Sequence, residues 1–164
     1  SSSLRLFVRD RDAIKILKID PSSDEASIGG GSEVNAIPKA KVASWSPDGL
    51  ALAAVDPASG VTIIEVPDGE GNHEGLRSHL IDRSSKTTQS LTWSPLGSSL
   101  VTISTVPKGS SEPNLQVWRR NHSGGCESGG GTGEYLCAAS FHHPKLQPDR
   151  QVVKWTMDET LCAR

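Results

Sequence analysis

Short apolar runs alternate with polar and glycine-rich stretches along the chain, and the runs have the length of strands rather than helices. Residues 14–19 alternate apolar and lysine positions, the pattern of a half-buried strand. A helix over residues 13–19 is the alternative, and its β-branched residues disfavour it. With the apolar run at 4–8 and the charged residues 9–12 between the two runs, this pattern predicts a β-hairpin.

One phrase, a tryptophan followed by a turn and an apolar run, occurs three times. It reads Trp-Ser-Pro-Asp-Gly from Trp45, Trp-Ser-Pro-Leu-Gly from Trp93 and, in degraded form, Trp-Thr-Met-Asp-Glu from Trp155. The copies are 48 and 62 residues apart. A period of about 40 to 50 residues is typical of the four-stranded blades of a β-propeller. We therefore predict an all-β, WD40-like propeller, with the tryptophans as packing residues.

The residue types of the first two copies favour a tight turn. Pro47 and Pro95 fix the φ angle that the first central position of a turn requires, and Gly49 and Gly97 suit the position where the chain leaves it. Proline cannot join a central ladder, so each copy also marks the end of a strand. The third copy has none of these residues and is the weakest turn prediction.

The pieces around these turns predict about three blades' worth of antiparallel strands. Residues 20–38 are predicted to form a loop, and the glycine-rich residues 119–133 a flexible insertion that lengthens the second interval. Counting two, four, four and two strands leaves both ends open, which predicts a fragment of a larger ring. The predicted parts are the end of a blade at 1–20, a blade at 39–82, a blade at 88–141 and the start of the next at 150–164.

The strand after each turn is almost wholly apolar, as residues 50–55 show. This pattern indicates a sheet that is buried on both faces between its neighbours. The same run is the longest apolar stretch of the chain, far short of the roughly 20 residues that cross a bilayer. The sequence therefore predicts no membrane contact.

Composition and charge narrow the classes of function. The 164 residues are 35% hydrophobic and only 4% aromatic, and the formal net charge is −2. No overall basic field would attract nucleic acid. Three cysteines without a framework spacing favour a reducing, cytoplasmic location.

The chain contains cysteines and histidines that could bind a metal, but their spacing in the sequence is not that of a zinc site. Structural zinc sites usually present ligands in pairs two to four residues apart, whereas the cysteines here stand alone. No phosphate-binding loop and no nucleophile elbow occurs. The sequence predicts no metal, no cofactor and no catalytic residue, with Cys137 and Cys162 as small core residues and His142 and His143 in a polar loop. The set considered for zinc is Cys126, Cys137, His142, His143 and Cys162.

Two small basic groups are the candidates for a surface that contacts RNA or a partner. Arg9 and Arg11 lie in the predicted hairpin, where aspartates dilute them, and Arg119 and Arg120 begin the glycine-rich insertion. Such groups contact phosphates, but they also occur on ordinary solvated surfaces.

Three segments resemble the N-terminal propeller of eukaryotic translation initiation factor two-A. They are residues 113–118 (Pro-Asn-Leu-Gln-Val-Trp), residues 132–136 (Thr-Gly-Glu-Tyr-Leu) and the tail from 153 to 164, which ends Asp-Glu-Thr-Leu-Cys-Ala-Arg. The chain departs from that family where Trp118 is followed by two arginines and the insertion. The propeller of the b subunit of initiation factor three is the nearest rival.

The resemblance implies a propeller of about nine blades in an intracellular, non-catalytic protein. It implies a scaffold that binds the small ribosomal subunit and is associated with delivery of initiator methionyl-tRNA, with mRNA and other initiation factors as further partners. It implies no small-molecule substrate. A generic WD-repeat scaffold for protein partners is the alternative, and an enzyme is the weakest reading.

Overall fold

The computed structural model describes residues 4–19, 32–40, 42–56, 58–65, 76–82, 87–121, 134–144, 146, 153–160 and 162–163. Every regular element in these ranges is a β-strand. Within the same ranges there is no helix long and apolar enough to cross a membrane. The strands are β1 Leu4–Arg9, β2 Ala13–Ile19, β3 Ser32–Pro38, β4 Ala43–Trp45, β5 Ala51–Asp56, β6 Gly60–Glu65, β7 Arg77–Asp82, β8 Thr88–Trp93, β9 Ser99–Ser104, β10 Leu115–Asn121, β11 Glu134–Phe141, β12 Lys154–Trp155 and β13 Cys162–Ala163.

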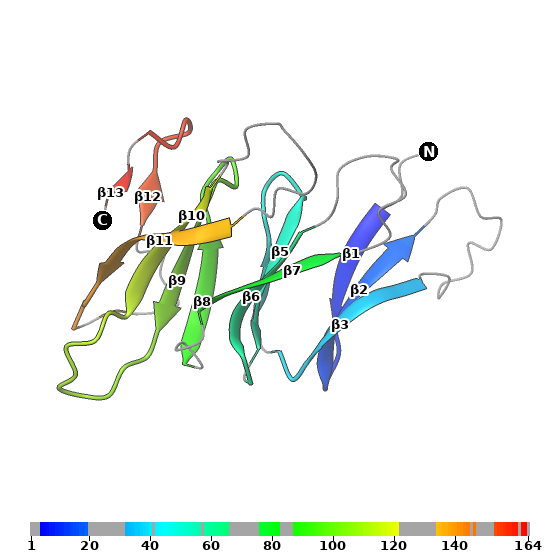
Figure 1. The fold of residues 1–164 in the computed structure, drawn as a ribbon, viewed down its shortest axis with the longest axis horizontal. Coiled ribbons are helices and arrows are strands. Elements are labelled where there is room, and N and C mark those ends of the chain that lie inside the picture. The colour runs from blue at the N-terminus through cyan, green and yellow to red at the C-terminus, as the bar shows by residue number, and fades with distance from the viewer. Residues whose placement is uncertain are drawn as a thin grey trace.

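The strands form antiparallel sheets in which each strand pairs with the next along the chain. The first sheet is β1-β2-β3, the second β4-β5-β6-β7, the third β8-β9-β10-β11, and the fourth, as far as it is described, β12-β13. They stand side by side from the first sheet to the fourth, and in the described ranges they do not close into a barrel (Figure 1). Strand β4 contacts β8, and β7 contacts β11. This arrangement is consistent with a partial β-propeller-like fold.

The strand predictions are confirmed where the hydrophobic pattern is clear and wrong where polar residues hide it. Residues 13–19 form a strand, not a helix. The predicted loop over 20–38 is wrong for residues 32–38, which form β3 because they pair with β2 and bury Ile37. The predicted insertion starts too early, because Arg119 and Arg120 belong to β10 and pair with β11. Residues 122–133 lie outside the described ranges.

The three copies of the repeated phrase form the same turn. In each, a backbone N–H donates to the carbonyl three residues earlier: Gly49 to Ser46, Gly97 to Ser94 and Glu159 to Thr156. The φ angles at the donors are 73°, 80° and 55°. Glycine adopts this left-handed region without cost, whereas a side chain there is strained. The weakest turn prediction is thus confirmed, with a glutamate where the other copies have glycine.

Adjacent residues of β5 belong to different cores. Ala51, Ala53 and Val55 pack between the second and third sheets with Leu91 and Leu100. Leu52 and Ala54 pack toward the first sheet with Ile14 and Ile16. Successive side chains of a strand point to opposite faces, so a strand between two sheets must be apolar throughout. The prediction of burial on both faces is confirmed.

Glu159 joins the fourth sheet to the third. Its carboxylate accepts hydrogen bonds from the backbone N–H of Leu96 and the hydroxyl of Ser98, both in the turn of the preceding copy. Burial raises the pKa of this carboxyl, but the hydrogen bonds from Ser98, Ser94 and Leu96 outweigh burial and leave the pKa below its usual value. The left-handed backbone at Glu159 is therefore accompanied by contacts that only its side chain can make.

Replacing Glu159 with glutamine should make the free energy of unfolding depend less on pH in the acid range. A carboxyl with a lowered pKa stabilises the fold above its unfolded pKa of about 4.5, and this contribution is lost as pH falls through the lower folded value. Urea unfolding at about pH 7 and about pH 3.5 should show a smaller loss for Glu159→Gln than for the unaltered chain. Equal losses in the two proteins would show that Glu159 does not couple the sheets.

Candidate functional site

A hollow of about 450 Å³ lies beside the third sheet, between the β9–β10 loop and the segment that follows β11. The β9–β10 loop lies at the end of the third sheet opposite the β8–β9 turn, which is one of the repeated turns (Figure 1). Its size is in the usual range of small-molecule sites. Its polar lining comprises Ser104, Thr105, Lys108, Ser110, Asn114, His142 and His143.

Asn114 fixes the two walls of the hollow to each other. Its side-chain oxygen accepts from the backbone N–H of His143 at 2.7 Å, and its side-chain NH₂ donates to the carbonyl of the same residue at 2.8 Å. Its backbone N–H donates to Phe141, and its carbonyl accepts from Ser104. Asn114 is only 6% exposed, so these bonds satisfy a buried amide.

His142 is held by one ring nitrogen. Its Nδ1 lies 2.8 Å from the carbonyl oxygen of Glu112. A carbonyl can only accept, so Nδ1 must carry the proton of this hydrogen bond. In the neutral ring Nε2 is then the proton acceptor. The backbone therefore selects the tautomer and limits rotation of the ring.

The opposite wall is a turn from Pro107 to Ser110. The N–H of Ser110 donates to the carbonyl of Pro107 at 2.9 Å, and Gly109 between them has φ of 85°. Such an angle favours glycine at this position of the turn. The side chain of Lys108 extends from the turn into an exposed position, and the hydroxyl of Ser110 accepts from Glu112 N–H, which leaves its own proton to donate. The turn can thus offer a cation and a hydroxyl to a ligand.

A cluster of charged and polar side chains lies between the second and third sheets. Nη2 of Arg120 lies 2.8 Å from Oε1 of Glu65, and Nε2 of His79 lies 3.4 Å from Oε2. Neither contact has the geometry of a hydrogen bond. Arg120 and Glu65 form an ion pair, and the His79 ring lies beside the same carboxylate. Glu65 is 8% exposed. The Arg120–Glu65 pair joins the second and third sheets.

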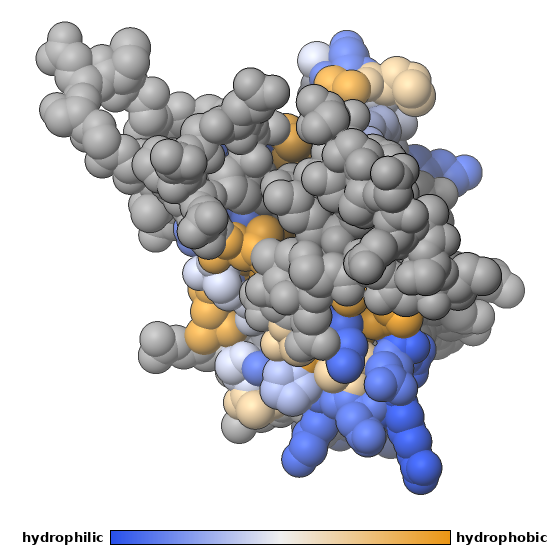
Figure 2. Space-filling view, turned by 90° about the vertical axis from the view of Figure 1, so that its right-hand side faces the viewer, coloured by the Kyte–Doolittle hydropathy of each residue, from blue (hydrophilic) through white to orange (hydrophobic). Residues whose placement is uncertain are grey.

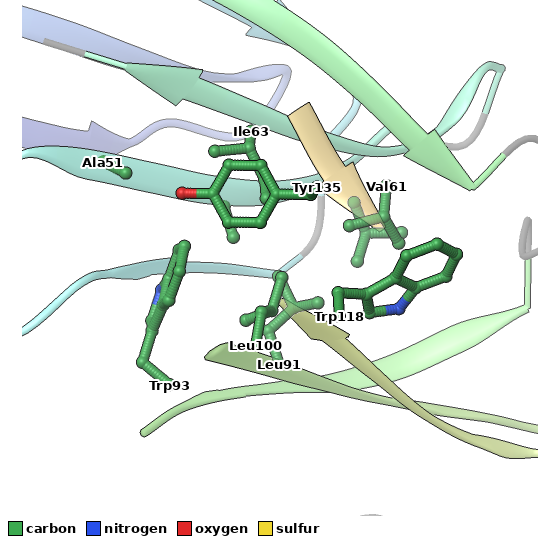
Figure 3. Packing of buried hydrophobic residues seen from close by; sticks show 10 residues of the cluster. Ala51, Val61, Ile63, Leu91, Trp93, Leu100, Trp118 and Tyr135 are labelled. Atoms are coloured by element: carbon green, nitrogen blue, oxygen red, sulfur yellow. The ribbon is translucent and has the colours of Figure 1, made fainter. Parts of the chain in front are cut away.

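Tyr135 lies beside this cluster, opposite Arg120 on the neighbouring strand. Burial raises the pKa of its phenol to about 12, with a smaller opposing effect from Arg120. The phenol therefore stays protonated in neutral and moderately alkaline solution. Its ring packs edge-on against Trp93 with 6.2 Å between centroids, which places it in the core (Figure 3).

The four arginines predicted as one kind of surface do not lie together. Arg9 and Arg11 are exposed at the β1–β2 hairpin. Figure 2, which looks onto the first sheet, shows hydrophilic side chains gathered at the lower end, where Figure 1 places that hairpin. Arg119 is exposed on β10 of the third sheet, where it pairs with Ser99, and Arg120 forms an ion pair with Glu65. Alternation along β10 sends the two adjacent arginines to opposite faces.

The repeated tryptophans pack as predicted. Trp93 is 8% exposed, and its indole N–H donates to the carbonyl of Ser44 in the second sheet at 2.9 Å. Trp45 packs against the core between the first and second sheets and contacts Phe7, with 6.4 Å between ring centroids. Trp155 packs against the core beside the third sheet.

The cysteines and histidines considered for zinc are not brought together in the described residues. No group of three or more potential ligands is found there. The prediction of a buried Cys137 is wrong: it is exposed, because β11 is the outer strand of its sheet. His142 and His143 lie after β11 in a loop, as predicted. Cys126 and the side chain of Cys162 lie outside the described part.

Comparison with known proteins shows a similar fold but assigns the chain to no family. No family model and no curated protein matches the chain. Among solved structures, a putative 6-phosphogluconolactonase from Bacteroides uniformis is similar with a TM-score of 0.54 and 16% identity. The alignment covers 96% of this chain and 43% of that one, so the chain spans less than half the length of the similar structure. The likeness is one of fold.

The prediction of a translation initiation scaffold is corrected by this comparison. The similar solved structure is named as a lactonase, and nothing found supports an initiation factor, ribosome binding or tRNA binding. The physical reason is that the three segments behind the resemblance, residues 113–118, 132–136 and 153–164, include parts of strands β10, β11, β12 and β13. Many sequences can form such strands, so short segments of this kind identify a fold more strongly than a function.

Proposed function

We propose that the chain is part of a β-propeller in which each four-stranded sheet is a blade, and that the hollow binds a small anionic ligand rich in hydroxyl groups. The blade assignment is supported by the repeated turn and by the face-to-face packing of successive sheets. It extends the sequence prediction of a WD40-like propeller.

The composition of the hollow carries the ligand proposal. Lys108 supplies a positive charge, and hydroxyls and amides supply hydrogen bonds, while none of the lining residues in the described part of the chain is acidic. An anion in this position gains charge-assisted hydrogen bonds, which are stronger than those between neutral groups. Hydroxyls of a ligand would find partners at Ser104, Thr105 and Ser110.

The similar solved structure adds support of a limited kind. Its name denotes an enzyme whose substrate is a phosphorylated sugar lactone, a molecule that is both anionic and rich in oxygen. At 16% identity this name does not transfer to the chain. It makes a phosphorylated sugar acid a sensible first probe.

Calorimetric titration with gluconate 6-phosphate tests the proposal. We expect binding that weakens as salt rises, since a charge contact between exposed groups is screened. Lys108→Ala should weaken binding roughly tenfold, the equivalent of about 1.4 kcal/mol. The matched control is Lys154→Ala, which removes the same charge from an exposed position of β12 outside the hollow and should leave affinity unchanged.

Uncharged glucose is the second control. Binding of glucose as tight as that of gluconate 6-phosphate would contradict an anion site. Equal effects of Lys108→Ala and Lys154→Ala would contradict the location in this hollow. Absence of binding to the unaltered chain would overturn the proposal.

A further inference from the structure

We infer that one edge of the first sheet is a docking site for an extended strand of a partner polypeptide. This site, the β1 edge, is the side of β1 that faces away from β2 (Figure 1). The strand that fits it ends in a tryptophan and has an acidic residue three positions earlier. The hollow is lined by residues between Ile103 and Leu146, so this inference does not depend on the ligand proposed above.

The first argument is the position of β1 in its sheet. In the second and third sheets the strand that begins the corresponding hairpin has neighbours on both edges, because β5 lies between β4 and β6, and β9 lies between β8 and β10. Among the described residues β1 pairs with β2 alone. Unpaired N–H and C=O groups at the edge of a sheet are a template for a further strand. The β1 edge is therefore the place where the first sheet can accept a counterpart of β4 and β8.

The second argument is a hydrogen bond that links the first strands of neighbouring sheets. The indole N–H of Trp93 in β8 donates to the carbonyl of Ser44 in β4 at 2.9 Å. Trp45 is the corresponding residue of the second sheet, and its ring centroid lies 6.4 Å from that of Phe7 in β1. The indole N–H of Trp45 forms no hydrogen bond with any described residue. A strand on the β1 edge would supply the carbonyl that Ser44 supplies to Trp93.

The third copy of the repeated turn does not keep this bond. The indole N–H of Trp155 is buried without an acceptor in the described part of the chain, although β8 is in place. This copy lacks the proline and the glycine of the other two. The comparison therefore rests on Trp45 and Trp93, which belong to the two intact copies.

The third argument is the register that such a strand would adopt. In the second sheet the N–H of Val55 donates to the carbonyl of Val42, three positions before the tryptophan, at 2.9 Å. Arg9 corresponds to Val55, because Arg9 pairs with Ile14 as Val55 pairs with Val61. Ile14 and Val61 are both buried on the side of their sheet that faces the next sheet. A strand on the β1 edge therefore places the residue three positions before its tryptophan opposite Arg9.

Arg9 gives the β1 edge a charge preference. Its side chain is exposed and forms no ion pair within the ranges that the structure describes. The carboxylate of the neighbouring Asp10 accepts from the backbone N–H of Arg11 at 2.6 Å. Opposite charges at directly facing positions of two strands attract each other. A partner strand with glutamate or aspartate opposite Arg9 is therefore bound more tightly than one with an apolar residue there.

A second copy of β1 is a poorer occupant than a strand of different sequence. Two copies paired antiparallel about Phe7 would bring Arg5 of each opposite Arg9 of the other. Like charges in facing positions are destabilising. The strands in the corresponding places, β4 and β8, contain no charged residue. The β1 edge therefore favours a partner strand that is uncharged in the two positions before its tryptophan.

Two short peptides with blocked ends test the inference on the unaltered chain. The first has the sequence of residues 41–47, and the second is the same peptide with the change Val42→Glu. We expect fluorescence anisotropy at low salt to show about two- to fivefold tighter binding of the glutamate peptide, the range for a facing charge pair. Arg9→Glu in the chain should reverse this preference. Arg11→Glu is the matched control, since this exposed arginine lies beyond the end of β1 and should leave the preference unchanged.

Hydrogen exchange locates the bound peptide. Saturation with the glutamate peptide should slow exchange at amides of β1 and at the indole N–H of Trp45, because both gain acceptors. Trp45→Phe keeps an aromatic ring but has no N–H, so it should weaken binding of both peptides by the same factor. The ratio of the two affinities should stay as in the unaltered chain.

Four results would overturn the inference. The first is that neither peptide binds, and the second is that the two bind equally well to the unaltered chain. The third is a preference for the glutamate peptide that persists in Arg9→Glu, since the peptide would then lie elsewhere. The fourth is protection of the β1 amides that rises with the concentration of the chain alone, which would assign the β1 edge to a second copy.

Discussion

Replacing Leu100 with alanine should lower the free energy of unfolding by about 2–5 kcal/mol. Leu100 is fully buried between the second and third sheets, where it meets Leu91 and the side chains of β5 and β6 (Figure 3). The substitution removes apolar contacts from both sheets at once. Backbone pairing with Trp93 and Trp118 on either side holds the strand in place, so the space is not readily refilled.

Urea unfolding of Leu100→Ala measures this effect, with Leu96→Ala as the matched control. Leu96 is 59% exposed in the turn that precedes the same strand, and its truncation should change stability by no more than about 0.5 kcal/mol. If both variants lost the same stability, the core between the sheets would not be where the structure places it.

Replacing Arg120 with methionine should cost about 3 kcal/mol, the lower end of the range for breaking a buried ion pair. The lower end applies because the Arg120 side chain is 23% exposed, against 10% for Glu65. The loss arises chiefly because the Glu65 carboxylate keeps its cost of burial and loses its arginine partner. A methionine fills most of the volume, so packing contributes little.

A double-mutant cycle separates the ion pair from other effects of Arg120→Met. Adding Glu65→Leu should recover much of the lost stability, because an apolar pair of similar volume has no desolvation cost. Arg119→Met is the control, since this exposed neighbour on β10 should change stability by about 0.5 kcal/mol or less. Additive losses in the double variant would contradict the contact between the two sheets.

The fold was largely predictable because the repeated turn has strict backbone requirements. Proline and glycine at fixed positions, with a tryptophan before them, predicted the strand ends at Trp45 and Trp93. The sequence did not predict the role of Glu159. This residue adopts the same left-handed φ angle as the glycines, and its side chain contacts another sheet. Such compensation depends on residues more than 60 positions away and leaves no local signal.

The candidate site was not predicted, since its residues do not form a motif. Lys108 and Asn114 lie in the β9–β10 loop and His142 in the segment after β11, and the pairing of β10 with β11 brings the two together. The separation of 28 positions between Asn114 and His142 in the sequence gives no indication that the two residues lie on the same hollow. Arg119 and Arg120 show the opposite error. They are adjacent in the sequence and were predicted to share a surface, but Arg119 is exposed and Arg120 pairs with Glu65.

The alternating side chains of β5 have a consequence for how the molecule loses its structure. Because Leu52 and Ala53 serve different interfaces, the second sheet has no core of its own that could survive alone. Detaching either neighbouring sheet exposes a full apolar face of the second sheet to water. The free energy lost at one interface therefore also lowers the stability of the sheet that forms the next interface. Cooperativity therefore resides in the contacts between sheets, and the smallest unit that can unfold is an interface between two sheets rather than a single sheet.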